Sequence, residues 1–148
     1  GKMHKKYLAV LCGKPVDNNG TYVDYLKQDK KNNCSRIVDK SDPESKRAEL
    51  EYKVLDCIQT EEKDPQYLSL VEIKLLTGRH HQIRVQFSGH GTPLYGDGKY
   101  GNNEKAVRKS LALCACHLKF KHPATGKIMD FQIKPDTGAF KLFSKNND

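Results

Sequence analysis

The sequence has no long hydrophobic run: no apolar stretch approaches the roughly 18 residues that a membrane-spanning helix needs. The amino-terminal segment GKMHKKYLAVLCGKP starts with basic residues, but its apolar part is too short for a signal peptide. These absences favour a cytoplasmic protein with no membrane partner. The 148 residues are enough for a single domain, spanning 1–148, with a real core.

The sequence also lacks the cysteine patterns of a disulfide framework or a zinc finger. Its five cysteines are odd in number and scattered, and no Cys-x-x-Cys pair occurs. Ordinary reduced thiols, as in a cytosolic protein, are the better interpretation. His80 and His81 could be read as metal ligands, but adjacent residues on a helix project about 100° apart. We therefore expect no metal site.

Positive charge is present in excess and is unevenly spread along the chain. Residues 1–65 carry 13 Lys and Arg against 12 Asp and Glu, a net charge of +1. Residues 66–134 carry 11 against 4, a net charge of +7, and residues 135–148 balance at 2 against 2. A structural surface usually mixes the two signs, whereas a concentrated positive field suits a phosphate backbone. The charge pattern therefore favours a nucleic-acid partner.

Alternation of apolar and polar residues predicts two β-hairpins. Residues 50–58 and 67–75 alternate with period two, and the polar run 61–65 joins them. Residues 111–120 and 128–133 form the second pair. The expected shorter elements are strands at 6–12 and 35–38, a strand or helical turn at 22–26, and a helical turn at 136–143. The expected class is α+β, with a mixed, mostly antiparallel β-sheet and short helices.

Residues 77–100 have a composition that a buried core element rarely shows. They include two arginines, three histidines and five glycines. We expect a helix that begins just after Thr77 as its N-cap and ends at Gly89 and Gly91, which can adopt left-handed backbone angles. Composition alone is compatible with two interpretations, a short amphipathic helix with a solvated basic side or a site for a polyanion.

The same stretch resembles the signature of the RluA-type RNA pseudouridine synthases, whose pattern runs TGRxHQIRVH and then GxP and GDxxYG. In the first half the matching residues are Thr77, Gly78, Arg79, His81, Gln82, Ile83, Arg84 and Val85. In the second half they are Gly91, Pro93, Gly96, Asp97, Tyr100 and Gly101. So many matches at fixed spacing are far more specific than an isolated glycine motif.

The resemblance extends over nearly the whole chain. Residues 6–10, 48–55 and 111–123 resemble three strand motifs of the family, KxYxAxV, AxxxYxVL and LxFxHP. The implied fold is part of a pseudouridine synthase catalytic domain, namely its carboxy-terminal part. The nucleophile of the family is the aspartate of an HRLDxxTSG motif, which this sequence does not contain. We therefore expect these 148 residues to be inactive as a synthase on their own.

The resemblance implies active-site roles for three positions. Tyr7 matches the tyrosine that lies against the target base, Arg84 matches the basic residue that pairs with the nucleophilic carboxylate, and Leu118 matches the aliphatic residue that packs on the uracil. Each has a plainer interpretation from sequence alone: strand core for Tyr7 and Leu118, and a phosphate contact for Arg84. Asp97 lies in a Gly-Asp-Gly turn sequence, where we expect its carboxylate to bind nearby backbone.

The implied activity is the isomerisation of uridine to pseudouridine in ribosomal or transfer RNA, without a cofactor. The residues expected to contact RNA lie in the basic part of the chain and are Arg79, His81, Lys99 and Arg108. The alternative is a non-catalytic RNA-binding module that uses only its basic surface.

Overall fold

The computed structural model describes residues 4–61, 63–101, 111–121, 124–125, 127–132 and 138–144. These residues form one seven-stranded sheet in the order β3-β2-β4-β5-β1-β6-β7, and every described strand pair is antiparallel. The strands are β1 (His4–Cys12), β2 (Asn19–Asp29), β3 (Cys34–Val38), β4 (Lys46–Gln59), β5 (Tyr67–Leu75), β6 (Leu113–Lys121) and β7 (Ile128–Gln132). The helices are α1 (Gln82–Gly89) and α2 (Lys141–Ser144), the latter preceded by a 3₁₀ turn, Gly138–Phe140. This arrangement confirms the antiparallel α+β class.

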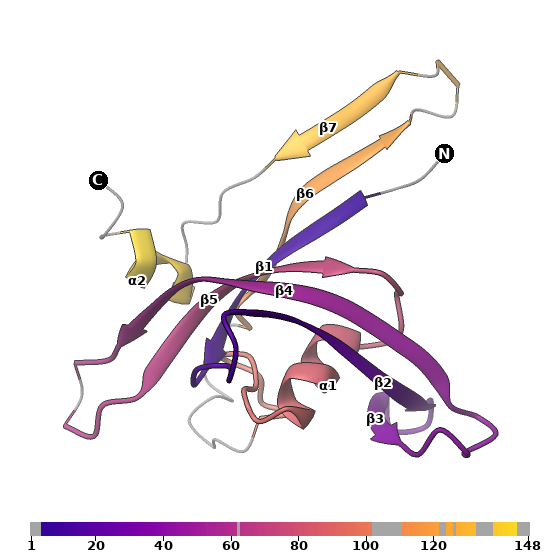
Figure 1. Cartoon of the computed structure of the whole chain (residues 1–148), viewed down its shortest axis with the longest axis horizontal. Coiled ribbons are helices and arrows are strands. Elements are labelled where there is room, and N and C mark those ends of the chain that lie inside the picture. Colours follow the sequence, from indigo (N-terminus) through magenta and orange to yellow (C-terminus); the bar gives the residue numbers. More distant parts are fainter. Residues whose placement is uncertain are drawn as a thin grey trace.

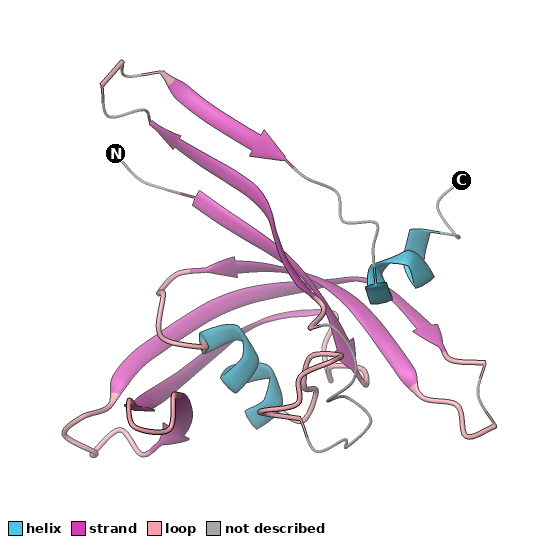
Figure 2. Ribbon diagram, turned by 180° about the vertical axis from the view of Figure 1, so that it is seen from behind, coloured by secondary structure: helices cyan, strands magenta, loops and turns pink. Residues whose placement is uncertain are grey.

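Both hairpins predicted from the sequence are confirmed. Strand β4 pairs with β5 from Leu50 opposite Leu75 to Gln59 opposite Tyr67, and β6 pairs with β7. Strand β2 is longer than the segment expected at 22–26, because it pairs with β3 on one side and β4 on the other. Figure 2 shows the β6–β7 hairpin projecting away from the rest of the sheet, whereas the β2–β3 hairpin lies beside α1.

The centre of the sheet is buried on both faces, which explains why β1 reads as a nearly continuous apolar run. Ala9 and Leu11 lie on the face covered by α1, and Val10 lies on the face covered by the carboxy-terminal helix, because side chains alternate along a strand (Figure 1). The core on the α1 side consists of Ala9, Leu11, Leu50, Tyr52, Val71, Ile73, Ile83, Phe87 and Leu94. The core on the α2 side consists of Val10, Leu68, Ala112, Ala139, Phe140 and Phe143.

Helix α1 differs from the expectation at its first turn. It begins at Gln82, five residues after Thr77, so Thr77 is not its N-cap. The residue before the helix, His81, has a left-handed backbone with φ of 54°. At the other end only Gly91 has the expected positive φ, 91°, whereas the helix ends at Gly89 with an ordinary backbone. A Cβ at Gly89 would lie 2.3 Å from Cδ1 of Ile37 in β3, so the end of that side chain would have to shift.

Candidate active site

A hydrogen-bond network fixes the segment between β5 and α1 to strand β4. The Thr77 hydroxyl accepts a hydrogen bond from the backbone N–H of Glu49 at 2.9 Å and donates one to Oε1 of Gln82 at 2.8 Å. The Gln82 side chain is buried, accepts from the backbone N–H of Arg79 and donates to the backbone carbonyl of Glu49. Thr77 and Gln82 therefore hold the start of α1 against the sheet, a role that replaces the predicted helix cap.

Arg84, the third residue of α1, forms a bidentate ion pair with Asp97. Its Nε lies 3.0 Å from Oδ2 and its Nη2 lies 2.9 Å from Oδ1. The Asp97 side chain is fully buried, whereas that of Arg84 is 20% exposed. The planar guanidinium suits two parallel hydrogen bonds to one carboxylate, so its orientation is fixed. Among the described residues the partner of Arg84 is thus Asp97, and none of them accepts a hydrogen bond from its Nη1 group.

Asp97 also organises the turn that contains it, as the sequence predicted. Its Oδ1 accepts hydrogen bonds from the backbone N–H groups of Lys99 and Tyr100, at 3.1 and 3.0 Å. Burial raises the pKa of Asp97, but the hydrogen bonds from Arg84 and Tyr100 outweigh burial, so the pKa lies below its ordinary value. Asp97 is therefore ionised at neutral pH and holds a fixed negative charge beneath Arg84.

Tyr100 completes the surroundings of Arg84. The Arg84 guanidinium carbon lies 5.0 Å from the centroid of the Tyr100 ring, a cation–π geometry. Burial raises the pKa of Tyr100, so the phenol keeps its proton at neutral pH. The phenol oxygen accepts from the backbone N–H of Ser35 at 3.0 Å and lies 2.6 Å from Nδ1 of His81. The phenol proton is thus free to be donated to a neutral His81.

His81 is held neutral by its surroundings. Burial lowers its pKa, and the electrostatic effects of His80, Arg84 and Lys99 lower it further. The two adjacent imidazoles stack at 3.8 Å between ring centroids. His80 in turn bonds to the β2–β3 hairpin, through Ser35 and Asn33 at 2.8 and 3.1 Å. His80 therefore joins the motif segment to that hairpin directly, whereas His81 does so through Tyr100.

Tyr7 lies on the same face of the sheet as α1. It is half-buried and packs against the core that includes Ile83 and Phe87 of that helix. In the sheet it stands between Ile73 of β5 and Ala115 of β6, where the β1–β6 register shifts at Lys6/Tyr7. Irregularities of this kind re-aim side chains and are common beside active sites.

Of the other predicted site residues, Leu118 is described through its backbone, which pairs with Lys5 of β1, two residues from Tyr7. Arg79 donates from Nε to the backbone carbonyl of Arg47 at 2.8 Å, and Lys99 donates from Nζ to the backbone carbonyl of Asn33. The structure therefore brings Arg79, His81 and Lys99 to the same end of the molecule, around the β2–β3 hairpin. Arg108 lies outside the described residues.

A second polar cluster, which the sequence analysis missed, joins α1 to β2. The buried Gln86 donates to Oδ2 of Asp24 at 2.9 Å, and Nε2 of His90 lies 2.9 Å from the same oxygen. The His90 ring stacks on Tyr22 with 3.8 Å between centroids. These partners lie more than 60 positions apart in the sequence, so no local pattern could indicate them. The cluster holds the carboxyl end of α1, and hence Arg84, in place.

Neither a metal site nor a membrane span is present among the described residues. No group of three His, Cys, Asp or Glu side chains there is arranged to hold a metal ion. No helix in that part of the chain is both long and apolar enough to cross a bilayer. The four cysteines that the structure describes, Cys12, Cys34, Cys57 and Cys114, form no disulfide with one another.

Comparison with known proteins agrees with this geometry. The sequence is 37% identical over 128 residues to an uncharacterized RNA pseudouridine synthase, YlyB, of Bacillus subtilis, covering 86% of this chain and 39% of the relative. It is 34% identical over 140 residues to the ribosomal large subunit pseudouridine synthase D of Zymomonas mobilis, covering 89% of this chain and 41% of the relative. The chain therefore spans about two fifths of the length of these curated relatives.

Solved structures show the same fold. The human RNA pseudouridylate synthase domain containing 1 superposes with a TM-score of 0.75 at 25% identity, covering 90% of this chain and 55% of the human one. The human RNA pseudouridylate synthase domain containing 4 has a TM-score of 0.71 at 23% identity, with coverage of 95% and 61%. The family model described as RNA pseudouridylate synthase matches residues 1–89, from β1 to the end of α1. The chain belongs to the RNA pseudouridylate synthase family.

Proposed function

We propose that this chain forms the part of an RNA pseudouridine synthase that receives the target uridine and supports the catalytic carboxylate. The reaction is an isomerisation: the C1′–N1 bond breaks, the detached uracil rotates, and a C1′–C5 bond forms. The proton on C5 is lost and N1 gains one, so the atoms balance without a cofactor. Because a helix or stacked loop hides these atoms, the nucleotide must first be flipped into a pocket.

The observation that carries the proposal is the orientation and partial exposure of the charged Arg84 side chain. A carboxylate that acts on the sugar must be ionised, although burial raises its pKa, and a neighbouring guanidinium lowers a carboxyl pKa by roughly 1–3 units. Arg84 is partly exposed, is permanently charged, and is oriented by a fully buried Asp97 that uses Nε and Nη2. Its remaining Nη1 donors suit a second carboxylate at the surface of α1.

Asp97 itself does not suit the part of the nucleophile. Its side chain has no exposure to solvent, and both of its oxygens already accept hydrogen bonds. The sequence has no HRLD motif, and we propose that the nucleophilic carboxylate comes from residues beyond these 148. Tyr7 would then lie against the base, and Leu118 would pack on the uracil.

The proposed substrate is RNA, with ribosomal RNA preferred over transfer RNA. Several relatives are named as ribosomal large subunit pseudouridine synthases, among them proteins of Zymomonas mobilis and Rickettsia bellii. The net charge of +7 on residues 66–134 supports a polyanionic substrate.

The test is tritium release from RNA labelled at C5 of uridine, measured for the full-length protein and for the 148-residue chain. We expect release by the full-length protein and none by the chain alone. Release by the 148 residues would show that the nucleophile lies within them. No release by the full-length protein from either ribosomal or transfer RNA would contradict the proposed function.

A further inference from the structure

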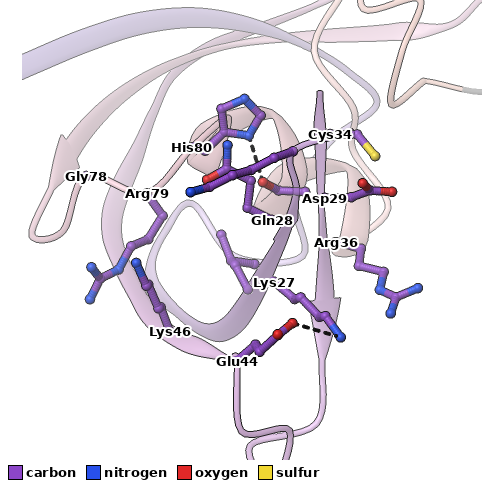
Figure 3. Close-up of a pocket in the computed structure, with 13 residues that line it drawn as sticks. Lys27, Gln28, Asp29, Cys34, Arg36, Glu44, Lys46, Gly78, Arg79 and His80 are labelled. Carbon is purple, nitrogen blue, oxygen red and sulfur yellow. Dashed lines mark hydrogen bonds and ion pairs between the residues drawn. The ribbon is translucent and has the colours of Figure 1, made fainter. Parts of the chain in front are cut away.

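A basic hollow lies between the β2–β3 hairpin and the segment that leads into α1 (Figure 3). It has a volume of about 850 Å³. Its lining residues come from three parts of the chain: the two strands of the hairpin, the start of β4, and Gly78, Arg79 and His80. The motif segment therefore forms one wall, and the hairpin, which carries no recognised motif, forms the other.

The cations of this basic hollow outnumber its anions. Five basic side chains line it, namely Lys27, Lys30, Arg36, Lys46 and Arg79, against Asp29 and Glu44. Glu44 is already paired with Lys27 at 3.3 Å. Asp29 is bound within its own turn, where its carboxylate accepts from the Asn32 side chain at 2.7 Å. Among the described residues, neither acidic group forms an ion pair with any of the other four cations.

The cations of the hollow differ in their surroundings. Arg36 stands directly opposite Lys27 in the β2–β3 pairing, but Lys27 is itself paired with Asp42 and Glu44. Arg79 is anchored through Nε to the carbonyl of Arg47, the neighbour of Lys46 in β4, which leaves its two terminal nitrogens for another acceptor. Figure 3 shows Lys46 and Arg79 at one side of the hollow and Arg36 at the other. A bound anion would therefore meet three cations, Arg36, Lys46 and Arg79, that form no ion pair among the described residues.

We propose that the basic hollow binds the phosphodiester backbone of the RNA substrate, next to the nucleotide that enters the active site. This inference rests on the proposed function. The cations stand on two sides of a space much larger than a single phosphate, as a run of successive phosphates requires. Polar side chains of Gln28 and Ser35 also line it. His80 lines the hollow and stacks on His81. His81 bonds to Tyr100, whose ring lies beside the Arg84 guanidinium, so the hollow adjoins the surroundings of that arginine.

The net charge along the sequence pointed to residues 66–134 as the source of the positive surface, but the hollow draws most of its cations from residues 1–65. Residues 1–65 are nearly neutral in sum, yet four of the five lining cations come from that part of the chain. Folding places these cations beside Arg79, while Asp42 and Glu44 from the same part of the chain pair with Lys27. A net-charge count along the sequence therefore misses this part of the surface.

The test compares two double variants of the full-length protein. Arg36→Gln with Lys46→Gln removes two exposed cations of the hollow, and Lys63→Gln with Lys127→Gln removes two exposed lysines from the tips of other hairpins. Affinity for a fluorescein-labelled substrate RNA is measured by fluorescence anisotropy over a range of salt concentrations. We expect the hollow variant to bind more weakly and its log–log salt slope to fall by about 1.4, which is about 0.7 for each single-strand phosphate contact. The control variant should keep the wild-type slope.

Equal slopes and affinities for the hollow variant and the wild type would overturn the inference, as would wild-type binding that does not depend on salt. Displacement of the RNA by inorganic phosphate at constant ionic strength would mark a free-phosphate site and also count against it. Tritium release separates the two proposals. A protein that releases tritium but shows no effect of the hollow variant refutes only the hollow, whereas a protein that shows the effect without releasing tritium refutes only the synthase activity.

Discussion

Replacement of Asp97 by Asn is expected to be strongly destabilising, although the two side chains have nearly the same shape. Asp97 accepts hydrogen bonds from Arg84 and from two backbone N–H groups of its own turn. An asparagine has only one acceptor oxygen, so its NH₂ group must face either the guanidinium or the turn, and both are donors. Arg84 would also lose the counter-charge that offsets its partial burial.

The magnitude follows from the exposure of the two partners. Removing one partner of a buried ion pair costs about 3–5 kcal/mol, because the other charge stays buried and unpaired. The Arg84 side chain is 20% exposed, so water can solvate part of its charge. We therefore expect a loss near the lower limit, about 3 kcal/mol. With an m-value of about 1.5 kcal/mol/M, the urea midpoint should fall by about 2 M.

Urea unfolding of wild type, Asp97→Asn and a control measures this loss. The control is Arg47→Gln, which breaks the exposed pair between Arg47 and Glu49 and should cost at most about 1 kcal/mol. Since the folded state holds the pKa of Asp97 below its ordinary value, the pair contributes fully above about pH 4 and is lost as the pH falls below that. The Asn variant should lack this acid dependence. A loss equal to that of the control would refute the account.

Two further changes have expected outcomes. Gly101→Ala should lower the free energy of unfolding in urea by about 1–3 kcal/mol, because its Cβ would lie 2.5 Å from the carbonyl oxygen of Asp97. Gly89→Ala should cost less, because its Cβ meets only the end of the Ile37 side chain, and equal losses for the two variants would contradict this. Because burial, and then nearby positive groups, lowers the pKa of His81, stability should fall as the pH drops below about 6.5. His81→Asn, which tolerates the left-handed backbone, should reduce that fall between about pH 7 and about pH 5, and an unchanged fall would exclude His81 as its source.

Two hairpins of this fold could be predicted from the sequence because their periodicity is local, whereas the pairings of β1 and β2 could not. The hairpin of β4 and β5 follows from alternation and a polar connection, and the structure has it in the same place. The start of α1 could not be read in this way. Thr77 resembles an N-cap, but its hydroxyl is bound to Glu49, 28 positions away, and that long-range contact delays the helix to Gln82. A distant partner overrode the local preference.

The contacts among the residues of the candidate site could not be predicted from the sequence. The motif identified Arg84 and Asp97, and the turn sequence indicated that Asp97 would bind nearby backbone, yet nothing in the sequence showed that they pair with each other. The bond between Tyr100 and Ser35 joins residues 65 positions apart and has no local signal. The same is true of the basic hollow, whose β2–β3 wall lacks any motif.

The most direct test of the account is turnover of the full-length protein with substitutions at Arg84, followed as tritium release on saturating RNA. Arg84→Met should abolish most activity at neutral pH and regain part of it as the pH rises, because desolvation then raises the pKa of the nucleophile unopposed. Arg84→Lys should lose less, because it keeps the charge but not the bidentate geometry. Arg79→Met should mainly weaken RNA binding. Normal turnover by Arg84→Met on saturating RNA, together with reduced RNA affinity, would make Arg84 a phosphate contact and contradict the assigned active site.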